Sequence, residues 1–289
     1  MEHISIVLPA RNEASSLKSL LPEIVSLCNR AEIIVVNDGS SDNTEDVARS
    51  LGIKVVNHPY SMGNGAAIKS GTRAATGKVI LFMDADGQHD PRDIEKMVKK
   101  YNDGYDMVVG ARNLKSHASF VRQIANRFFN RLASLMTGFK VEDLTSGFRI
   151  VNARKFRRFL YLLPNGFSYP TTSTMAFFRS GYSVGYIPIA GRKREGKSKI
   201  RLLHDGLRFI VIILKIGALF SPMRLFLPIS FLLFMVGSLY YGYTYYTSGR
   251  FTNMSAVIIL SSLTSFLIGI VSEQISSLHY RISDRDNES

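Results

Sequence analysis

The sequence predicts an α/β domain with a mostly parallel sheet, followed by a helix at a membrane interface and two transmembrane helices. Up to residue 112, short apolar runs alternate with amphipathic runs, which is typical of α/β domains. Polar clusters follow the apolar runs directly. Near residue 205 the composition changes, and long apolar stretches dominate the rest of the chain.

Five apolar runs are short enough to be buried strands, and helical patterns separate them. The predicted strands cover residues 4–8, 32–36, 53–56, 79–83 and 107–109, and the predicted helices cover 13–25, 43–51, 63–75 and 90–101. Strands that are apolar on both faces and alternate with helices form parallel sheets.

Polar residues follow four of these strands, in the clusters 11–13, 37–39, 84–86 and 110–112. The carboxyl ends of parallel strands meet at one edge of a sheet, and ligands bind there. We therefore expect these clusters to form one site.

Asp84 and Asp86 lie one residue apart at the end of an apolar run, so both carboxylates should point the same way. Like charges so close repel each other unless a cation lies between them. Oxygen ligands beside a phosphorylated substrate favour Mg²⁺ or Mn²⁺. The alternative is a polar loop before the helix that Asp90-Pro91 begins.

Gly63-Asn64-Gly65 with Lys69 at the start of a predicted helix resembles a phosphate cradle. It matches neither the P-loop nor the dinucleotide-binding motif. The alternative is a flexible turn that leads into the helix.

The formal charge of +13 indicates an anionic partner, which could be nucleic acid, a membrane or a phosphorylated substrate. The positive charge gathers near the apolar stretches and no nucleic-acid motif is present, so we expect no nucleic-acid partner. Cys28 is the single cysteine, which excludes a disulfide framework. The N-terminus lacks the basic and apolar regions of a signal peptide, so we expect the first domain to stay where it is made.

The motifs 9–13 (PARNE), 36–42 (VNDGSSD) and 84–86 (DAD) resemble those of glycosyltransferase family 2, over roughly residues 1–200. This resemblance implies the GT-A fold. The segments 84–89, 146–149 and 194–199 further resemble the polyprenyl-phosphate sugar transferases, typified by dolichol-phosphate mannose synthase. A hexose would then pass, with inversion, from a UDP- or GDP-linked sugar to undecaprenyl or dolichyl phosphate.

The resemblance also implies roles for individual residues. The donor nucleotide would be bound by Pro9, Arg11, Asn12, Glu13, Asp38, Asp84 and Ala85, and we expect Lys69, from the segment that resembles a phosphate cradle, to join them. The divalent metal would be bound by Asp84, Asp86 and Gln88, and the catalytic residues would be Asp86, Asp143 and Arg194. In relatives that act on sugar hydroxyls, an aspartate near Asp143 is the general base. A phosphate acceptor is already an anion and needs no strong base, so Asp143 would then orient the acceptor or bind the site's cations.

A helical pattern over residues 119–136 has a basic face and an apolar face. The apolar face is expected to be buried and contains Val121, Ile124, Ala125, Phe128, Leu132, Leu135 and Met136. The basic face could be merely solvated. We expect it to bind a lipid phosphate, together with a basic loop at 192–199 that also suits anionic headgroups. The predicted acceptor-phosphate residues are Arg112, Arg122, Arg131, Ser134 and Lys197.

Residues 204–220 carry Asp205, Arg208 and Lys215, which favours an interfacial helix over a membrane span. Residues 225–246 and 256–278 are long enough to span, and Glu273 in the second span is a candidate functional acid. We expect a catalytic domain (1–203), an interfacial helix (204–222) and a two-helix anchor (223–289). The distribution of Arg and Lys predicts that the catalytic domain and the C-terminus are cytoplasmic.

Three alternatives to this function fit the sequence to different degrees. A family 2 enzyme could act on the sugar hydroxyl of a glycan or glycolipid. One that extends a polysaccharide through its own channel would need a Gln-x-x-Arg-Trp motif and more spans, but the chain has no tryptophan. A non-catalytic nucleotide-sugar-binding protein would not need Asp84 and Asp86. The sequence leaves the nucleotide, the sugar and a homo-oligomeric state open.

Overall fold

The computed structural model describes residues 4–112, 120–166, 168–190, 202–250 and 252–285. The chain divides into two compact units. The first contains Met1–Arg131 and Lys140–Ile212, and the second contains Leu132–Phe139 and Ile213–Ser289. Helices α5 (Phe120–Thr137) and α8 (Leu202–Phe220) contribute residues to both units. The expected functional segments 1–203, 204–222 and 223–289 stay a prediction.

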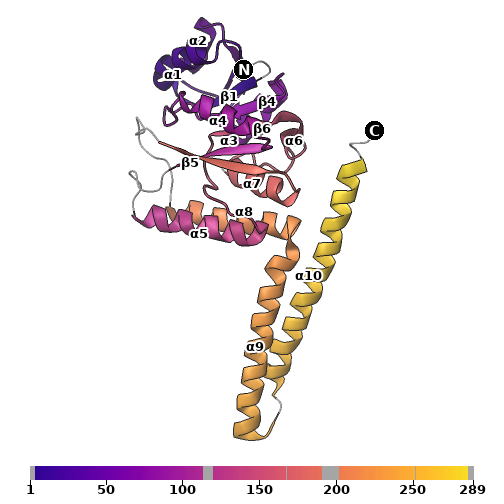
Figure 1. Ribbon diagram of the computed structural model, residues 1–289. Coiled ribbons are helices and arrows are strands. Elements are labelled where there is room, and N and C mark those ends of the chain that lie inside the picture. The colour runs from indigo at the N-terminus through magenta and orange to yellow at the C-terminus, as the bar shows by residue number, and fades with distance from the viewer. Residues whose placement is uncertain (1–3, 113–119, 167, 191–201, 251, 286–289) are drawn as a thin grey trace. The chain divides into compact units, whose positions relative to one another are not determined.

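A seven-stranded sheet with the order β3-β2-β1-β4-β6-β5-β7 forms the centre of the first unit (Figure 1). The strands are β1 (Ile4–Ala10), β2 (Glu32–Asn37), β3 (Lys54–Asn57), β4 (Val79–Phe82), β5 (Met107–Arg112), β6 (Arg149–Asn152) and β7 (Val184–Ile189). Strand β6 is antiparallel to β4 and β5, and the other neighbouring strands are parallel. The predicted mostly parallel sheet is confirmed.

Helices cover both faces of this sheet, which is why its strands are apolar on both sides. The helices of the first unit are α1 (Ala14–Leu27), α2 (Thr44–Ser50), α3 (Asn64–Ala74), α4 (Asp93–Asn102), α6 (Ala153–Arg157) and α7 (Tyr169–Arg179), together with parts of α5 and α8. Ile6 and Leu8 of β1 share a core with Leu17 of α1 and Ile94 of α4. Val7, between them, faces the other side, where α3 packs against β1 and β2.

The five predicted strands and the helices between them are all present, with bounds that shift by a few residues. Strands β6 and β7 and helices α6 and α7 were not predicted. Helix α7 contains a run of Thr and Ser, residues with low helix propensity, and its side chains are almost all buried. Burial against the sheet therefore outweighs propensity there. Strand β7 contains Pro188, a residue that suits only the edge position β7 occupies.

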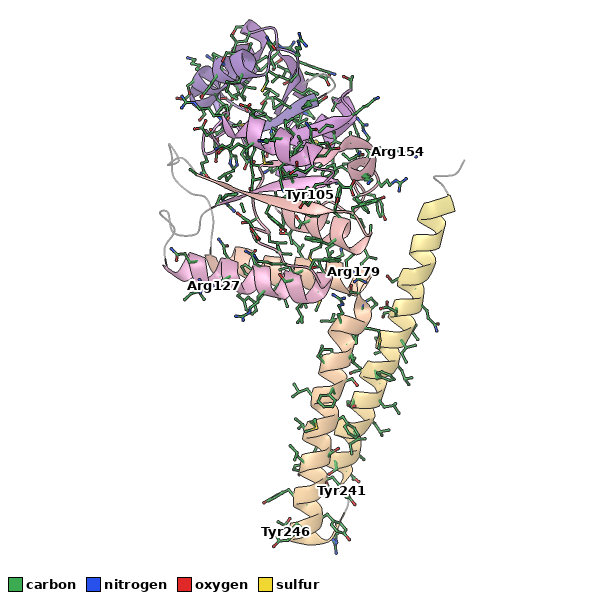
Figure 2. All side chains as sticks on the ribbon, viewed as in Figure 1. Tyr105, Arg127, Arg154, Arg179, Tyr241 and Tyr246 are labelled. Atoms are coloured by element: carbon green, nitrogen blue, oxygen red, sulfur yellow. The ribbon has the colours of Figure 1, made fainter. Side chains whose placement is uncertain are left out.

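The second unit contains helices α9 (Pro222–Ser248) and α10 (Asn253–Arg285), which run side by side as a hairpin (Figure 1). Pro222–Ser248 and Asn253–Ser276 each contain an apolar stretch of 18 residues, with mean hydropathies of 1.7 and 2.2. Only 11% and 17% of the residues in these stretches are buried. A core helix of this hydropathy would be mostly buried. Both segments are thus long and apolar enough to be candidate membrane spans, as predicted. Figure 2 shows Tyr241 and Tyr246 toward the closed end of the hairpin.

Glu273 lies against the first turn of α9. Its Oε2 accepts a hydrogen bond from the backbone N–H of Met223 at 3.3 Å, and Ser276 one turn later donates to the carbonyl of Leu219 at 2.7 Å. The first N–H groups of a helix have no partner within the helix, and a carboxylate satisfies them well. This acid therefore has a structural role at the start of α9.

Candidate active site

The carboxyl ends of β1, β2 and β4 meet at one edge of the sheet, because β1 is parallel to both neighbours. The register aligns Ala10 with Asn37 and Val7 with Phe82. The loops that follow these strands therefore leave the sheet on the same side, as predicted. They carry most of the residues predicted to bind the donor and the metal.

Asn12 ties the loop after β1 to the loop after β2. Its Oδ1 accepts from the backbone N–H of Ser41 at 2.8 Å, and its own N–H donates to Ser40 Oγ at 3.0 Å. Asn12 has a φ of +56°, a left-handed conformation that Asn tolerates better than most residues. In addition, Asp42 accepts from the N–H of Ala14 at 3.1 Å. The donor-binding loop predicted from the sequence is thus held in one conformation.

Three other predicted donor residues lie on or beside this loop. Pro9 is half-buried in β1, Arg11 is exposed, and Glu13 is half-buried with its Oε2 accepting from Ser16 Oγ at 3.0 Å. The structure brings them together at the sheet edge, and their contacts with a nucleotide stay a prediction.

Asp38 is buried and holds the loop that leads into α3. Its oxygens accept from His58 Nδ1 (2.7 Å), Ser61 Oγ (2.9 Å), and the N–H groups of Met62 (2.8 Å) and Gly63 (2.9 Å). Burial by itself would raise the pKa of Asp38, but these hydrogen bonds, led by His58, lower it below its usual value. These four donors occupy both oxygens of the carboxylate. The structure gives Asp38 a positioning role, and its role in nucleotide binding stays a prediction.

The start of α3 packs against residues 164–166. The N–H of Gly65 donates to the carbonyl of Gly166 at 2.9 Å, and Lys69 Nζ donates to Asn165 Oδ1 at 2.6 Å. A Cβ on Gly65 would lie 1.9 Å from the carbonyl oxygen of Pro164. This close packing accounts for a glycine at residue 65 without any need for a bound phosphate. Nucleotide binding by Lys69 stays a prediction.

The carboxylates of Asp84 and Asp86 lie on the loop after β4. The N–H of Gln88 donates to Asp86 Oδ1 at 3.2 Å, and His89 Nε2 lies 3.4 Å from Asp84 Oδ2. Ala85 is buried in the core, so only its backbone can face a ligand. Burial favours a higher pKa for Asp84. The hydrogen bond from His89 and the charges of two arginines outweigh burial and lower this pKa, so the group is an anion at neutral pH.

These residues suit a hard divalent cation. Within the described residues, no three His, Cys, Asp or Glu side chains form a metal cluster. The chain supplies two carboxylates and the amide of Gln88, and a donor diphosphate could supply further oxygens. Gly147 leaves room for the Asp84 carboxylate, because a Cβ at residue 147 would lie 2.6 Å from Asp84 Oδ2.

Asp143 lies in the acceptor loop, the name used here for residues 138–148, between α5 and β6. Arg112 at the end of β5 forms a bidentate contact with Asp143, from Nε to Oδ2 at 3.0 Å and from Nη2 to Oδ1 at 3.2 Å. The N–H groups of Thr145 and Ser146 also donate to Oδ1. Burial raises the pKa of Asp143, but the charge and hydrogen bonds of Arg112 lower it overall. A carboxylate held in this way is a weak base.

Arg149 and Tyr169 hold the other end of the acceptor loop, and the sequence assigned neither a role. Arg149 is fully buried and donates to the carbonyl of Ser146, to that of Pro170 at 3.0 Å and to Ser173 Oγ at 2.7 Å. Tyr169 donates to the carbonyl of Gly147 at 3.0 Å. The only sequence signal was the Ser-Gly-Phe-Arg motif at 146–149. Its arginine supports the loop from inside the core.

Helix α5 differs from its predicted packing. Three side chains expected on its buried face are exposed, namely Ile124 (54%), Phe128 (53%) and Leu135 (63%), whereas Phe129, Ala133 and Met136 are buried. Arg127 and Arg131 are also exposed, and Figure 2 shows Arg127 projecting from α5. Exposed apolar and basic side chains on one helix are typical of a membrane interface.

The remaining predicted acceptor residues are only partly described. Ser134 is half-buried on α5. The side chain of Arg122, and all of Arg194 and Lys197, lie outside the described residues. Their predicted roles stay predictions.

Comparison with known proteins identifies two sequence families. The profile of Glycosyl transferase family 2 matches residues 5–160, which is more than half of the chain. The profile of the GtrB C-terminal hairpin matches residues 221–278, the region of α9 and α10.

The chain is 30% identical to the dolichyl-phosphate hexose transferase of Haloferax volcanii over 202 residues, which cover 69% of this chain and 87% of that protein. It is 35% identical to the undecaprenyl-phosphate 4-deoxy-4-formamido-L-arabinose transferase of Pseudomonas fluorescens over 193 residues. That match covers 60% of this chain and 56% of the relative, so the chain spans little more than half of the relative's length.

Among solved structures, glucosyl-3-phosphoglycerate synthase from Mycobacterium tuberculosis, in complex with Mn²⁺, UDP and glucosyl-3-phosphoglycerate, is similar with a TM-score of 0.62. The similarity covers 75% of this chain and 80% of that one at 21% sequence identity. At this identity the similarity shows the fold, and it confirms the expected GT-A-type architecture.

Proposed function

This chain belongs to glycosyltransferase family 2, and on that premise we propose that it transfers a hexose from a UDP- or GDP-linked sugar to a polyprenyl phosphate. The products are a lipid-phosphate-linked sugar, inverted at the anomeric carbon, and a nucleoside diphosphate. The names of the Haloferax and Pseudomonas relatives, both polyprenyl-phosphate transferases, support this acceptor class.

The donor lies at the carboxyl edge of the sheet in this proposal. Arg11 and Glu13 face the base and ribose from the loop after β1, and Asp38 keeps the neighbouring loop in place. Asp84, Asp86 and Gln88 hold a divalent ion, Mg²⁺ or Mn²⁺. When bound, this ion stabilises the charge that develops on the leaving diphosphate. The similar Mycobacterium synthase was solved in complex with Mn²⁺ and UDP, which supports this arrangement.

The observation that carries the choice of acceptor is the Arg112–Asp143 pair. A sugar hydroxyl needs a general base, and a good base has a pKa near the working pH. Asp143 has a lowered pKa, and its oxygens already accept hydrogen bonds from Arg112 and from the acceptor loop. A phosphate monoester is already ionised at neutral pH and attacks without losing a proton to a base. Asp143 therefore orients Arg112 toward an anionic acceptor.

The acceptor's chain needs a membrane, and the candidate spans supply an anchor. The exposed apolar side chains of α5 let this helix lie at the membrane surface, with Arg131 near the lipid phosphate. We propose that the catalytic unit and the C-terminus are cytoplasmic. Arg and Lys are frequent before the first span and Arg281 and Arg285 follow the second, whereas the loop between the spans has one Arg.

The test uses purified protein in detergent with undecaprenyl or dolichyl phosphate, Mg²⁺ or Mn²⁺, and a panel of radiolabelled nucleotide-sugars. We expect metal-dependent transfer of label to the lipid from one donor. Asp86→Ala should abolish it, whereas Asp46→Ala, a change at an exposed aspartate of α2, should not. If no donor labels the lipid, the function is wrong. If Asp86→Ala stays fully active, the metal assignment is wrong.

A further inference from the structure

Asn130 joins helix α5 to both sides of Asp143. Its Nδ2 donates to the carbonyl oxygen of Glu142 at 2.6 Å, and its Oδ1 accepts from the N–H of Leu144 at 3.1 Å. One side-chain amide thus pairs with the backbone groups that flank Asp143, as a neighbouring strand would do.

The acceptor loop needs such a partner because it lies between α5 and β6 and contains no helix or strand within the described residues. Arg149 and Tyr169 hold its 146–147 end through backbone carbonyls. Asn130 holds the 142–144 end. The direction of the Asp143 carboxylate depends on this backbone, because the loop's own N–H groups bind it.

Asp143 in turn holds Arg112. The carboxylate binds Nε and Nη2 of the guanidinium, and Nη2 also donates to Thr145 Oγ1 at 2.5 Å. The hydrogen bonds among the described residues do not use Nη1. Asn130 fixes the loop backbone on both sides of Asp143, and Asp143 orients the guanidinium of Arg112. Asn130 therefore determines the direction in which Arg112 Nη1 can donate to an anion.

Asn130 also directly precedes Arg131, an exposed cation on the same turn of α5. Two cations of the proposed phosphate site therefore come from different elements, with Arg131 on α5 and Arg112 on β5. Asn130 bonds α5 to the loop that holds Arg112. Without these bonds, each cation could still bind phosphate, but their spacing would vary.

We propose that Asn130 is a positioning residue for the lipid-phosphate acceptor. It acts through Asp143 and Arg112 and sets their place relative to Arg131. This inference rests on the proposed function and adds to it a residue that touches neither substrate. It concerns the acceptor, because most of the proposed donor residues lie on the loops after β1, β2 and β4.

The experiment compares Asn130→Asp and Asn130→Ala with the wild type. The first variant keeps the side chain's size and the bond from Leu144 but loses the donor to Glu142. The matched controls are Asn126→Asp and Asn126→Ala, one turn earlier on α5, where the half-buried amide makes no hydrogen bond among the described residues. For each protein we would measure kcat, the KM for undecaprenyl or dolichyl phosphate, the KM for the donor, and hydrolysis of the donor without lipid.

We expect both Asn130 variants to raise the KM for the lipid phosphate about tenfold, as expected for one or two lost hydrogen bonds. Their donor KM and donor hydrolysis should match the wild type, and the Asn126 variants should match it throughout. Equal acceptor KM values in the Asn130 and Asn126 variants would overturn the inference. So would an equal rise in donor KM, which would indicate general loosening. If one Asn130 variant does not fold, the other decides. A wild type that transfers nothing to lipid counts against the proposed function instead.

Discussion

Asp143→Asn keeps the size of a buried side chain and removes its charge. The carboxylate accepts six hydrogen bonds, three from Arg112 and three from the acceptor loop. An amide can keep the loop's bonds to one oxygen, but its NH₂ group cannot accept from the guanidinium. The substitution therefore tests mainly the ionic part of the Arg112–Asp143 pair.

The magnitude follows from the two side-chain bonds at 3.0 and 3.2 Å. Hydrogen bonds to charged groups contribute about 1.5–3 kcal/mol each. Arg112 stays 38% exposed, so water takes over part of its solvation and we expect a net loss of about 2 kcal/mol. For a domain of roughly 200 residues this lowers the Tm by about 4–8 °C.

The assay is thermal unfolding in detergent of the wild type, Asp143→Asn, Arg112→Met and the double variant. A direct pair predicts a coupling free energy of about 1–2 kcal/mol between the two substitutions. Arg49→Met, at an exposed partner of Glu45, is the control for losing a surface arginine. Additive single effects, within about 0.5 kcal/mol, would refute the pairing.

The same pair makes a prediction about pH. A lowered folded pKa means that the stabilisation is complete above the ordinary value of about 3.9 and is lost as pH falls through the folded pKa. Asp143 should therefore stay ionised near neutrality, and the transfer rate should show no acid limb from it at pH 6–7. An acid limb there that disappears in Asp143→Asn would identify a general base and favour the hydroxyl-acceptor alternative.

Three further outcomes follow from single side chains. Gly147→Ala should displace Asp84 and so raise the metal concentration for half-maximal transfer about tenfold. Gly166→Ala is the control, because a Cβ there meets nothing within 4 Å. Equal Mn²⁺ affinities of Gly147→Ala and the wild type, measured by electron paramagnetic resonance, would contradict this prediction. Glu32 is partly buried, which raises its pKa, but hydrogen bonds from Ser5, Thr76 and Lys54 lower the pKa to about 2. The stabilisation that ionised Glu32 gives the fold should be complete above pH about 4.3 and be lost as pH falls toward 2. In urea unfolding, Glu32→Gln should therefore lower the free energy of unfolding by about 2 kcal/mol at pH 7 but not at pH 2. Arg149→Met should lower the free energy of unfolding by about 3 kcal/mol, because it leaves buried carbonyl groups without a hydrogen-bond donor. A loss below about 1 kcal/mol would show that the acceptor loop does not need Arg149.

Local patterns predicted much of the catalytic unit. The alternation of apolar and amphipathic runs depends on neighbours in sequence, so it located β1 to β5 and the helices between them. Parallel pairing then placed the polar loops at one edge without coordinates. The pattern did not locate β6, and it failed at α7, where burial overrides the low helix propensity of threonine.

The roles of single side chains were harder to predict. The sequence assigned Arg112 to the acceptor and Asp143 to catalysis, and the structure joins them in one ion pair. The nucleotide roles of Asp38 and Lys69 stay predictions, and the structure adds bonds that join Asp38 to the 58–63 loop and Lys69 to Asn165. These bonds join residues far apart in the chain, and no periodicity reveals them.

The sequence alone thus determined the fold class, the family resemblance, the edge of the sheet where the site lies and the two apolar helices. These properties follow from hydrophobic spacing and short motifs, which are local. Only the tertiary structure decided that Asn130 brackets Asp143, that Asp143 holds Arg112 and that Arg149 supports the acceptor loop from the core. Such contacts depend on how a loop without secondary structure satisfies its buried polar groups, and its partners come from whichever elements the fold brings near.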